Sequence, residues 1–381
     1  MVVQSPQNIL FLGRYTKYCF RLIHRKSTLV SLPLKDKLPE KISCFRDDRV
    51  TQIIDVRTPA EFVEDHIPGA INLPVLNNDE RAIVGETYSR NQFQARKTGA
   101  AIISRHIAEH IDEYFSTKDS EFSPLIYCWR GGQRSHSMAL VLAQIGFMSY
   151  VLEGGYKCYR HAVLEELNSL PQKFEFKVIS GMTGNGKTKI LQYLGDHGHQ
   201  IIDLEALAKH KGSVLGLWHG ETQPSQKYFD SLLVDTLSKL SCDRPVWVES
   251  ESVRIGNIYI HPNFFSSLQK ANRYCINLPL DERVKHTISD YQNWIKNKDE
   301  LKVIIQKLVR IRGQKQIDHW LKLIENNQWE EFVRCMLVEH YDPTYSASQK
   351  KNNHSDKVAE QVDLLNLGEK SLHDLMTRLT R

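Results

Sequence analysis

Short apolar segments alternate with amphipathic ones along the chain from about Arg49 onward. Three of them have the length and continuous hydrophobicity of buried strands: Thr51–Val56, Leu125–Cys128 and Tyr150–Leu152. Thr98–Phe115 carries isoleucines at helical spacing, and Ser135–Ile145 forms a second helical pattern that stops at Gly146. Strands that alternate with helices predict a parallel α/β sheet.

A second alternating unit follows the first. It begins with the apolar strand pattern of Phe176–Ser180, passes through a glycine-rich turn and continues as a helix. Gln200–Leu204 and Val246–Glu249 have the pattern of further strands. Asn168–Lys173, which contains Pro171, is predicted to link the two units.

The chain beyond Asp281 is polar and mostly helical in pattern, and Ser346–Asp356 is predicted to be a loose loop. We therefore expect four regions: a basic leader over 1–40, a first α/β domain over 49–167, a second α/β domain over 174–280 and a helical region over 281–381.

The composition is that of a globular protein, with 41% hydrophobic and 25% charged residues. No apolar run approaches the roughly 18 residues that cross a bilayer, so no membrane association is expected. The formal net charge of +5 permits nucleic-acid binding without arguing for it. Seven cysteines, an odd number without a CxxC pair, argue for free thiols in a reducing compartment. His197 and His199 lack an evident third ligand, so neither zinc nor haem is expected.

The first 35 residues contain no Asp or Glu, but they include Arg14, Lys17, Arg21, Arg25, Lys26 and Lys35. An acid-free start that bears arginines is typical of an organelle transit peptide, which would place the protein in mitochondria. The alternative is a disordered leader, or translation assigned from too early a methionine. That alternative leaves the protein cytoplasmic, which is the compartment that we expect.

One cysteine lies in an unusual loop. The segment Cys128–Ser135, CWRGGQRS, follows a predicted strand and precedes a predicted helix. Its two glycines let backbone amides turn toward one atom, and the helix adds the positive end of its dipole, so we expect a thiolate that accepts a sulfur or selenium atom. The residues expected around this sulfur and an anionic donor are Arg130, Gly131, Gly132, Arg134 and Ser135. A buried structural cysteine is the alternative interpretation.

Two upstream motifs accompany this loop. Asp55–Arg57, DVR, ends a predicted strand, and His66–Ala70, HIPGA, follows it. With the C-x-x-G-G-x-R-S loop, and in this order and spacing, they resemble the rhodanese family over about Arg49–Leu167. The resemblance implies that Cys128 forms a persulfide. It also implies that Asp55 and Arg57 support the loop more often than they take part in chemistry.

A second loop carries phosphate chemistry. Gly181–Thr188, GMTGNGKT, matches G-x-x-x-x-G-K-[ST] without a departure, and it lies between a predicted strand and a predicted helix. The expected phosphate-binding residues are Gly181, Gly184, Gly186, Lys187 and Thr188, and Thr188 is also a candidate ligand of Mg²⁺. The motif does not distinguish a nucleotide from another diphosphate.

An acidic partner for Mg²⁺ should lie at the end of another strand. Asp203, Glu249 and Glu251 are the candidates, and an exposed carboxylate or a helix cap is the alternative for each.

The combination of the two loops is more specific than either loop. From Val50 to about Tyr345 the chain resembles the tRNA 2-selenouridine synthase family. The matching stretches are Asn77–Ala82, Val84–Gly85, Cys128–His136, Glu153–Lys157, the phosphate loop, Asp203–Ser213, Glu249–Ser252 and Tyr341–Pro343. The family tends to read EDESR where this chain has ESESV over 249–253, which puts any role of the missing Asp and Arg in doubt. The basic leader is also additional to the family pattern.

The resemblance implies a rhodanese-like parallel-sheet domain followed by a P-loop NTPase-like α/β domain with a mostly helical C-terminal part. It implies a transferase that acts on 2-thiouridine at the wobble position of tRNA. Geranyl diphosphate and selenophosphate are the implied co-substrates, Cys128 is the implied selenium carrier, and a selenophosphate-producing enzyme is an expected partner. Our hypothesis is that the phosphate loop holds the geranyl diphosphate, with Lys187 and Mg²⁺ stabilising charge.

Three other functions remain open. A sulfurtransferase with a nucleotide-dependent phosphate loop would use the same cysteine chemistry. A non-catalytic scaffold fits less well, since Cys128 and Lys187 are both intact. A small-molecule kinase with an appended redox domain would turn over ATP without tRNA. For tRNA itself, Arg283–Lys315 holds nine Lys or Arg against three acidic residues, although a solvated helix face has the same composition.

Overall fold

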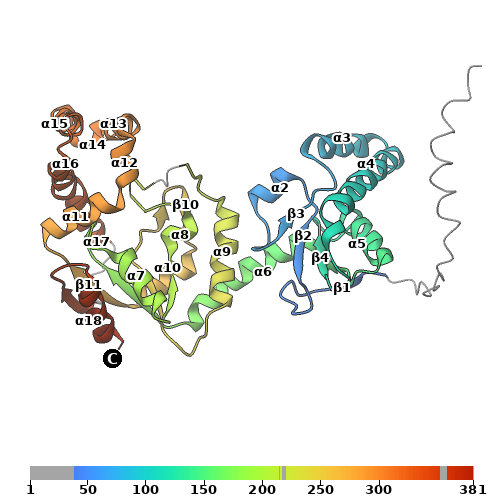
Figure 1. The fold of residues 1–381 in the computed structure, drawn as a ribbon, viewed down its shortest axis with the longest axis horizontal. Helices are drawn as coiled ribbons and strands as arrows, with labels where there is room; N and C mark the ends of the chain where they lie inside the picture. The colour runs from blue at the N-terminus through green and yellow to red at the C-terminus, as the bar shows by residue number, and fades with distance from the viewer. Residues whose placement is uncertain (1–37, 214, 217–219, 352–357, 381) are drawn as a thin grey trace, which may run out of the picture.

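The computed structural model describes residues 38–213, 215–216, 220–351 and 358–380, so nearly all of the predicted leader lies outside it. The first part of the chain forms a parallel five-stranded sheet in the order β1-β5-β4-β2-β3 (Figure 1). Its strands are β1 (Glu40–Ile42), β2 (Gln52–Asp55), β3 (Ile71–Asn72), β4 (Pro124–Tyr127) and β5 (Tyr150–Leu152). The three predicted strands are confirmed, whereas the short edge strands β1 and β3 were not predicted.

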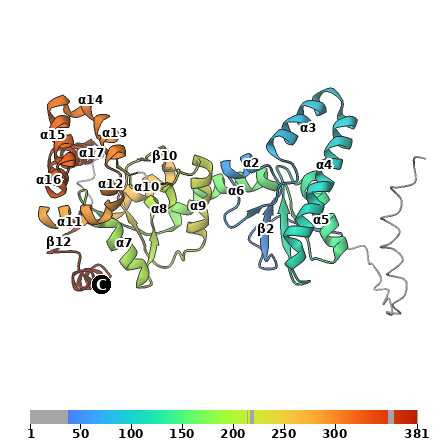
Figure 2. The ribbon, with the colours of Figure 1, turned by 45° about the horizontal axis from the view of Figure 1, so that its top comes forward.

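Helices lie on both sides of this sheet. They are α2 (Pro59–Glu64), α3 (Asn78–Arg90), α4 (Gln92–Glu113), η1 (Phe115–Thr117), α5 (Gln133–Ile145) and α6 (Gly155–Ser169). The predicted helix Thr98–Phe115 is the C-terminal part of α4, which begins earlier because the Asn91 side chain accepts a hydrogen bond from the backbone N–H of Gln94. Helices α3 and α4 form a hairpin at one end of the molecule (Figure 2).

A second parallel five-stranded sheet follows, in the order β12-β11-β6-β8-β7. Its strands are β6 (Phe176–Ser180), β7 (Gln200–Ile202), β8 (Val246–Glu249), β11 (Asn272–Asn277) and β12 (Val358–Asp363). Its helices are α7 (Lys187–Asp196), α8 (Leu204–Ala208), α9 (Gln226–Ser238), α10 (Pro262–Lys270) and α18 (Glu369–Leu379), and a small antiparallel pair consists of β9 (Arg254–Ile255) and β10 (Ile258–Tyr259). Because β6 is the central strand, the phosphate loop that follows it opens between β8 and β11.

The C-terminal region is mostly helical, as predicted, but it is not helical throughout. Its elements are α11 (Leu280–Asp290), α12 (Gln292–Lys296), α13 (Lys298–Gln306), α14 (Val309–Arg312), α15 (Gln314–Glu325), α16 (Trp329–Cys335), the π-helix η3 (Met336–Tyr341) and α17 (Asp342–Lys351). The loop predicted over Ser346–Asp356 is wrong up to Lys351, where α17 continues; residues 352–356 lie outside the description. The chain then returns to the second sheet as β12, an edge strand in which Val362 is the one buried residue, too weak an apolar pattern to predict a strand.

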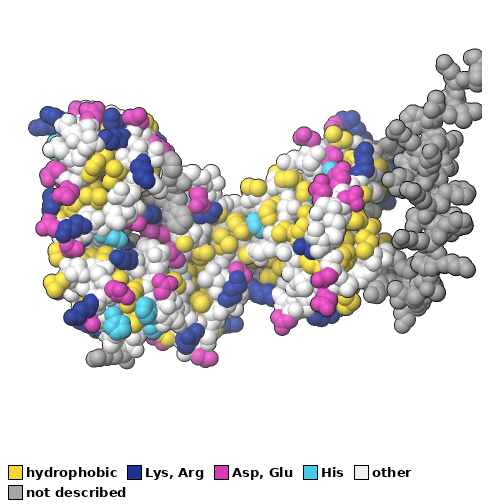
Figure 3. Space-filling view, viewed as in Figure 1, with side chains coloured by type: hydrophobic (Ala, Val, Ile, Leu, Met, Phe, Trp, Pro, Cys, Tyr) yellow, Lys and Arg dark blue, Asp and Glu magenta, His cyan; other side chains and the backbone are white. Residues whose placement is uncertain are grey.

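One hydrophobic cluster bridges the two sheets. Helix α6 continues directly into the 3-10 turn η2 (Leu170–Lys173), so the predicted linker is an ordered helical connection. A single cluster of buried side chains includes Tyr127 and Tyr159 from the first part and Phe229 and Leu233 from the second. The molecule narrows at this junction (Figure 3), but α6 and α9 pack directly against each other there. In the part of the chain that the structure describes, no helix combines the length and apolarity needed to cross a membrane.

Candidate functional site

The Cys128 sulfur lies in a cradle of hydrogen-bond donors. Cys128 follows β4 and is only 3% exposed. Its Sγ accepts hydrogen bonds from the backbone N–H of Gly132 and from the hydroxyl of Ser135, each at 3.2 Å. Gly132 is the N-cap residue of α5, so the positive end of that helix points at the sulfur. A negative charge on this sulfur, or on an atom bound to it, is therefore stabilised by the loop.

The two arginines of the loop differ in availability. Arg134, expected to attract an anionic donor, instead donates to Glu61 at 2.9 Å, and both side chains are largely buried. Burial raises the pKa of Glu61, but the hydrogen bond and charge of Arg134 outweigh burial and hold that pKa below its usual value. Arg130 is exposed, with no hydrogen bond or ion pair to another described residue. Arg130 is thus the arginine of this loop that is free to meet an anion.

The segment after β5, which begins with Gly154 and Gly155, packs against the backbone of the cysteine loop. The backbone N–H groups of Tyr156 and Lys157 donate to the carbonyls of Cys128 and Trp129, at 2.9 and 3.0 Å. Gly155 has φ +59°, and a Cβ there would lie 2.3 Å from the Cys128 carbonyl oxygen and 2.4 Å from the Gly131 nitrogen. Only glycine allows the two backbones to approach this closely. The sequence analysis identified Glu153–Lys157 only as a stretch that matches the family, without a structural role.

Gly155→Ala should therefore displace the cysteine loop. The new methyl group would contact fixed backbone atoms, and we expect a loss of about 2–4 kcal/mol of unfolding free energy. Thermal unfolding measures the effect. Gly198→Ala is the matched control, since Gly198 has φ +84° but open space around its Cβ position. Equal effects of the two substitutions would show that backbone strain, and not contact with the loop, is responsible.

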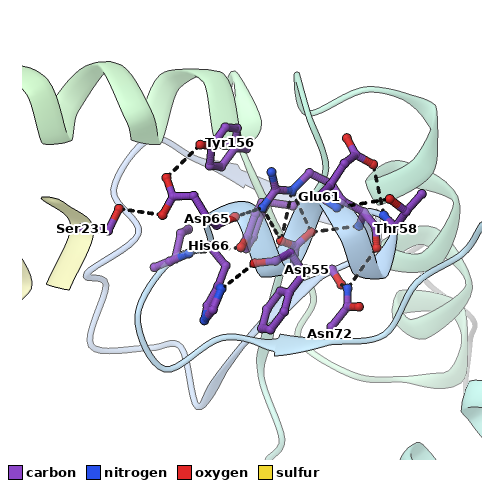
Figure 4. Close-up of polar contacts among 12 residues, drawn as sticks. Asp55, Thr58, Glu61, Asp65, His66, Asn72, Tyr156 and Ser231 are labelled. Atoms are coloured by element: carbon purple, nitrogen blue, oxygen red, sulfur yellow. Dashed lines mark hydrogen bonds and ion pairs between the residues drawn. The ribbon is translucent and has the colours of Figure 1, made fainter. Parts of the chain in front are cut away.

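A buried polar network joins the cysteine domain to α9 (Figure 4). The Arg57 guanidinium donates to the Asp55 carboxylate and to the Asp65 carbonyl, both at 2.6 Å, and lies over the Tyr156 ring. The Asp65 carboxylate accepts hydrogen bonds from the hydroxyls of Tyr156 on α6 and Ser231 on α9, both at 2.8 Å. Burial raises the pKa of Asp65, although both hydroxyls and the nearby arginines oppose the shift. In this geometry Asp55 and Arg57 hold the frame of the domain and do not face the sulfur.

The phosphate loop connects β6 to α7. Its glycines Gly181, Gly184 and Gly186 all have positive φ, and a Cβ on Gly181 would lie 2.6 Å from the Ile276 carbonyl oxygen. The Lys187 ammonium donates to the Gly181 carbonyl at 3.2 Å, across the mouth of the loop. The loop is thus closed around its own lysine, in the form expected to exchange that contact for phosphate oxygens.

The C-terminal segment holds the phosphate loop in place. Arg283 donates through Nε to the Thr183 carbonyl at 2.9 Å and pairs with both carboxylate oxygens of Asp342, at 2.6 and 3.0 Å. The Gly181 N–H donates to the Tyr345 hydroxyl at 3.2 Å. The sequence analysis missed these roles of Asp342 and Tyr345, because residues so distant in sequence give no local signal.

This arrangement also changes the predicted tRNA surface over Arg283–Lys315. Arg283 is buried against the phosphate loop, and Arg312 donates to His340 and Thr344. Neither guanidinium is available to a nucleic acid. The exposed basic residues of the segment without a partner among the described residues are Lys296, Lys307, Arg310 and Lys315.

Three carboxylates converge beside Thr188. Its hydroxyl donates to Glu249 at 2.9 Å and to Glu205 at 3.3 Å. Oxygens of Glu205, Glu249 and Glu251 all lie within 4.8 Å of one another. The predicted candidate Asp203 lies at the edge of the same pocket, but its carboxylate caps α8 by accepting from Ala206 N–H at 2.8 Å. Glu205 was missed because β7 ends at Ile202, and the first turn of α8 then carries Glu205 toward β8.

The carboxylate cluster favours a cation. Burial raises the pKa of Glu205 and of Glu251, each to about 8, and raises the pKa of Glu249 well above its usual value. Repulsion among the three is the second cause in each case. Carboxylate and hydroxyl oxygens are hard ligands of the kind that Mg²⁺ prefers. The residues present therefore fit the predicted Mg²⁺ site, with Glu205 in the place expected for Asp203.

The same shifts predict a pH-dependent stability. Because the folded pKa values lie above the unfolded value of about 4.3, this contribution to stability is complete below that pH and is lost as the pH rises through about 8. Mg²⁺ should bind the ionised cluster, raising the melting temperature by roughly 3–6 °C near pH 8.5 and by little near pH 5. Melting curves with Mg²⁺ or with EDTA measure the difference. Glu249→Gln should remove most of the response and the exposed Glu86→Gln should keep it; an equal response at both pH values would contradict the assignment.

A persulfide-type cysteine loop and a phosphate loop on two joined parallel sheets define a rhodanese-like module coupled to a P-loop module. Family models match both: a rhodanese-like domain over residues 39–162 and a tRNA 2-selenouridine synthase AAA domain over residues 174–304. The chain belongs to the tRNA 2-selenouridine synthase family.

Individual relatives share this name. The tRNA 2-selenouridine synthase of Nitrosomonas europaea is 35% identical over 63% of this chain, and the match spans 63% of that relative's length. The proteins of the same name from Bdellovibrio bacteriovorus and Sulfurovum sp. are 34% and 31% identical, over 68% and 79% of this chain and 69% and 90% of their own.

Proposed function

We propose that this protein converts 2-thiouridine at the wobble position of tRNA to 2-selenouridine in two steps. The base sulfur is first geranylated by geranyl diphosphate, and selenium from selenophosphate then replaces the geranylthio group. The observation that carries the proposal is the presence, in one family member, of an anion-stabilising cysteine cradle and a phosphate loop faced by carboxylates.

In the first step the thiocarbonyl sulfur attacks the terminal carbon of the geranyl group. A C–S bond forms, the C–O bond to the diphosphate breaks, and diphosphate leaves with the bonding electrons. Lys187 and the backbone amides of Gly181–Thr188 bind the leaving group and stabilise its growing charge. Alkylation is needed because a thiocarbonyl sulfur leaves poorly, whereas an alkylated sulfur can leave as a thiolate.

The proposed Mg²⁺ would be held by Thr188 and by the carboxylates of Glu205, Glu249 and Glu251. When bound, it neutralises charge on the diphosphate. The hydrogen bond from the Thr188 hydroxyl to Glu249 also holds the phosphate loop and the carboxylates in position before substrate binds.

In the second step selenium carried on Cys128 is transferred to C2 of the base. A C2–Se bond forms, the C2–S bond breaks, and geranylthiol leaves. The Gly132 amide and the Ser135 hydroxyl stabilise the anionic selenium while it is bound. Selenophosphate carries selenium at the selenide level, so loading requires a two-electron oxidant, which a mixed disulfide of Cys128 with a thiol supplies: selenium attacks Sγ, the thiol leaves, and water breaks the Se–P bond to release phosphate. After the selenium has attacked C2, a thiol attacks Cys128 Sγ, breaks the S–Se bond and restores the mixed disulfide, so the cycle needs no net oxidant or reductant. The exposed Arg130 is the proposed contact for the anionic selenophosphate.

A nucleoside assay tests the proposal. The protein is incubated with 2-thiouridine tRNA, geranyl diphosphate, selenophosphate, Mg²⁺ and a thiol, and digested nucleosides are analysed by mass spectrometry. S-geranyl-2-thiouridine should appear without selenophosphate, and 2-selenouridine should appear with it. Absence of both products, beside an active relative as control, would refute the proposal. Turnover of a sulfur donor without any change to tRNA would support the sulfurtransferase alternative.

A further inference from the structure

The hairpin of α3 and α4, which projects from the first sheet, has an uneven distribution of charge (Figure 2). Its segment from Thr87 to Arg105 contains no Asp or Glu, but it carries Arg90, Arg96 and Lys97 besides Arg105 itself. The acidic residues of both helices lie outside this segment. We call 87–105 the basic hairpin segment; it presents positive charge without carboxylates of its own.

The exposed face of α4 combines these cations with an aromatic ring. Four exposed residues lie at every fourth position of the helix: Phe93, Lys97, Ala101 and Arg105. They span about 18 Å along the helix axis. The Phe93 side chain is 71% exposed, and the Lys97 ammonium lies 5.4 Å from the centre of its ring. Arg96, beside this row, is exposed and has no ion pair with any residue that the structure describes.

The base of the hairpin is fixed beside the cysteine loop. The side-chain oxygen of Asn78, at the start of α3, accepts a hydrogen bond from the Ala60 N–H of α2 at 3.1 Å. The next residue of α2, Glu61, accepts a hydrogen bond from Arg134 of the cysteine loop at 2.9 Å. A polyanion that lies along the hairpin is thereby directed toward the loop that carries Cys128.

This surface has the chemistry that recognises unpaired RNA. Lysine and arginine side chains contact backbone phosphates, and unstacked bases stack on exposed aromatic rings. The segment first predicted to bind tRNA, 283–315, offers less, because Arg283 and Arg312 are engaged within the protein. The basic hairpin segment has no such internal neutralisation at Arg96 or Lys97, since neither forms an ion pair within the described part of the chain.

We propose that the basic hairpin segment binds the anticodon arm of tRNA. Arg96, Lys97 and Arg105 contact backbone phosphates, and Phe93 stacks on an unpaired base. The inference rests on the proposed function and deepens it, because it assigns the tRNA contact to a surface of the cysteine domain.

The salt dependence of tRNA binding tests the phosphate contacts. Binding of a fluorescently labelled, unmodified tRNA transcript is measured by anisotropy over a series of KCl concentrations. Each lost phosphate contact reduces the slope of log affinity against log salt by about 0.7–0.9. The triple variant Arg96→Ala, Lys97→Ala, Arg105→Ala should therefore show a slope that is shallower by about 2, and an affinity about 10-fold or more lower at roughly 0.1 M salt. All three side chains are exposed, so the variant should fold normally.

The matched control removes three cations from the other candidate surface. Lys307→Ala, Arg310→Ala and Lys315→Ala change the net charge by the same amount, and these side chains are also exposed. This variant should keep the wild-type slope and affinity. An equal loss in the two triple variants would mean that tRNA responds only to net charge, and a loss confined to the control would place tRNA on the C-terminal helices. Either result would overturn the inference.

Phe93→Ala tests the stacking contact. The substitution should lower tRNA affinity about fivefold or more without changing the salt slope, because stacking on a neutral ring releases no counterion. Phe93→Trp should retain the affinity. An unchanged affinity of Phe93→Ala would overturn the stacking contact. If the same substitution also dissociated a dimer in sedimentation, the exposed ring would belong to an interface between copies of the chain.

The outcomes separate this inference from the proposed function. If the wild-type protein modifies tRNA but the hairpin triple variant binds it as the wild type does, only the inference fails. If the hairpin substitutions weaken tRNA binding as expected but no modified nucleoside forms, the tRNA surface stands and the proposed chemistry is refuted.

Discussion

Cys128→Ala should abolish selenium incorporation and cause S-geranylated tRNA to accumulate. Cys128 Sγ is the sulfur held by the Gly132 amide and the Ser135 hydroxyl, and an alanine leaves nothing there to carry selenium. Removal of a group that bonds covalently to the transferred atom typically costs at least roughly 10³-fold in rate. In the proposed mechanism geranylation uses the phosphate loop on the second sheet, so its rate should remain within about twofold of wild type. Quantitative mass spectrometry of nucleosides over time measures both steps.

Cys242→Ala is the matched control, because Cys242 is an exposed free cysteine far from both loops in the sequence. It should leave both steps unchanged. Thermal unfolding should show that Cys128→Ala remains folded, since the change removes one buried atom and leaves the Gly155 contact intact. A Cys128→Ala protein that still makes 2-selenouridine would mean that selenophosphate attacks the base directly, with the cradle binding only an anion.

The sequence predicted the elements whose pattern depends on burial. The strand Phe176–Ser180 and the strand Val246–Glu249 are fully or largely buried and were located to the residue. Helix α3 was missed because it contains no buried residue, so it has no apolar periodicity to detect. The edge strand β12 was not predicted for a similar reason, because Val362 is its one buried residue. Patterns report burial, and elements at the surface leave little pattern.

Among the site residues, those in local motifs were predicted, whereas those positioned by tertiary packing were not. Motifs placed Cys128 and Lys187 in loops because their local spacing defines the turn. Glu205 and Asp342 could not be found this way, since their positions depend on where α8 begins and on how α17 packs against the phosphate loop. Arg134 and Arg283 have the charge expected of anion-binding or tRNA-binding residues. The structure shows each neutralised by a carboxylate from a distant segment.

The junction between the sheets bears on how the two steps are linked. The shared core and the Asp65 network leave the two modules as one packed body, since Ser231 of α9 bonds directly to a carboxylate of the cysteine domain. In the proposed mechanism the geranylated base would then have to move from the phosphate loop to the cysteine loop. Each of the two half-reactions should accordingly be lost by mutation without loss of the other. The Cys128 substitution tests whether selenation can be lost while geranylation is kept.

Lys187→Ala tests whether geranylation can be lost while selenation is kept, and it should abolish geranylation. The Lys187 ammonium donates to the Gly181 carbonyl across the mouth of the loop, and in the proposed mechanism it stabilises the diphosphate as the C–O bond breaks. Loss of one such electrostatic contact typically costs about 10²–10³-fold in rate. Selenation should stay within about twofold of wild type when the protein is given tRNA that is already S-geranylated. Nucleoside analysis with each of the two tRNA substrates separates the steps.

Lys239→Ala is the control for loss of a lysine, because the ion pair of Lys239 with Asp235 lies at the surface and should matter little. A Lys187→Ala protein that geranylates normally but has lost an ATP hydrolysis present in wild type would assign the phosphate loop to a nucleotide. Loss of both half-reactions, with unchanged unfolding, would mean that the phosphate loop also serves selenium transfer. Loss of geranylation alone, beside the complementary loss in Cys128→Ala, would place alkylation on the second sheet and selenium transfer on the first, in one chain and in that order.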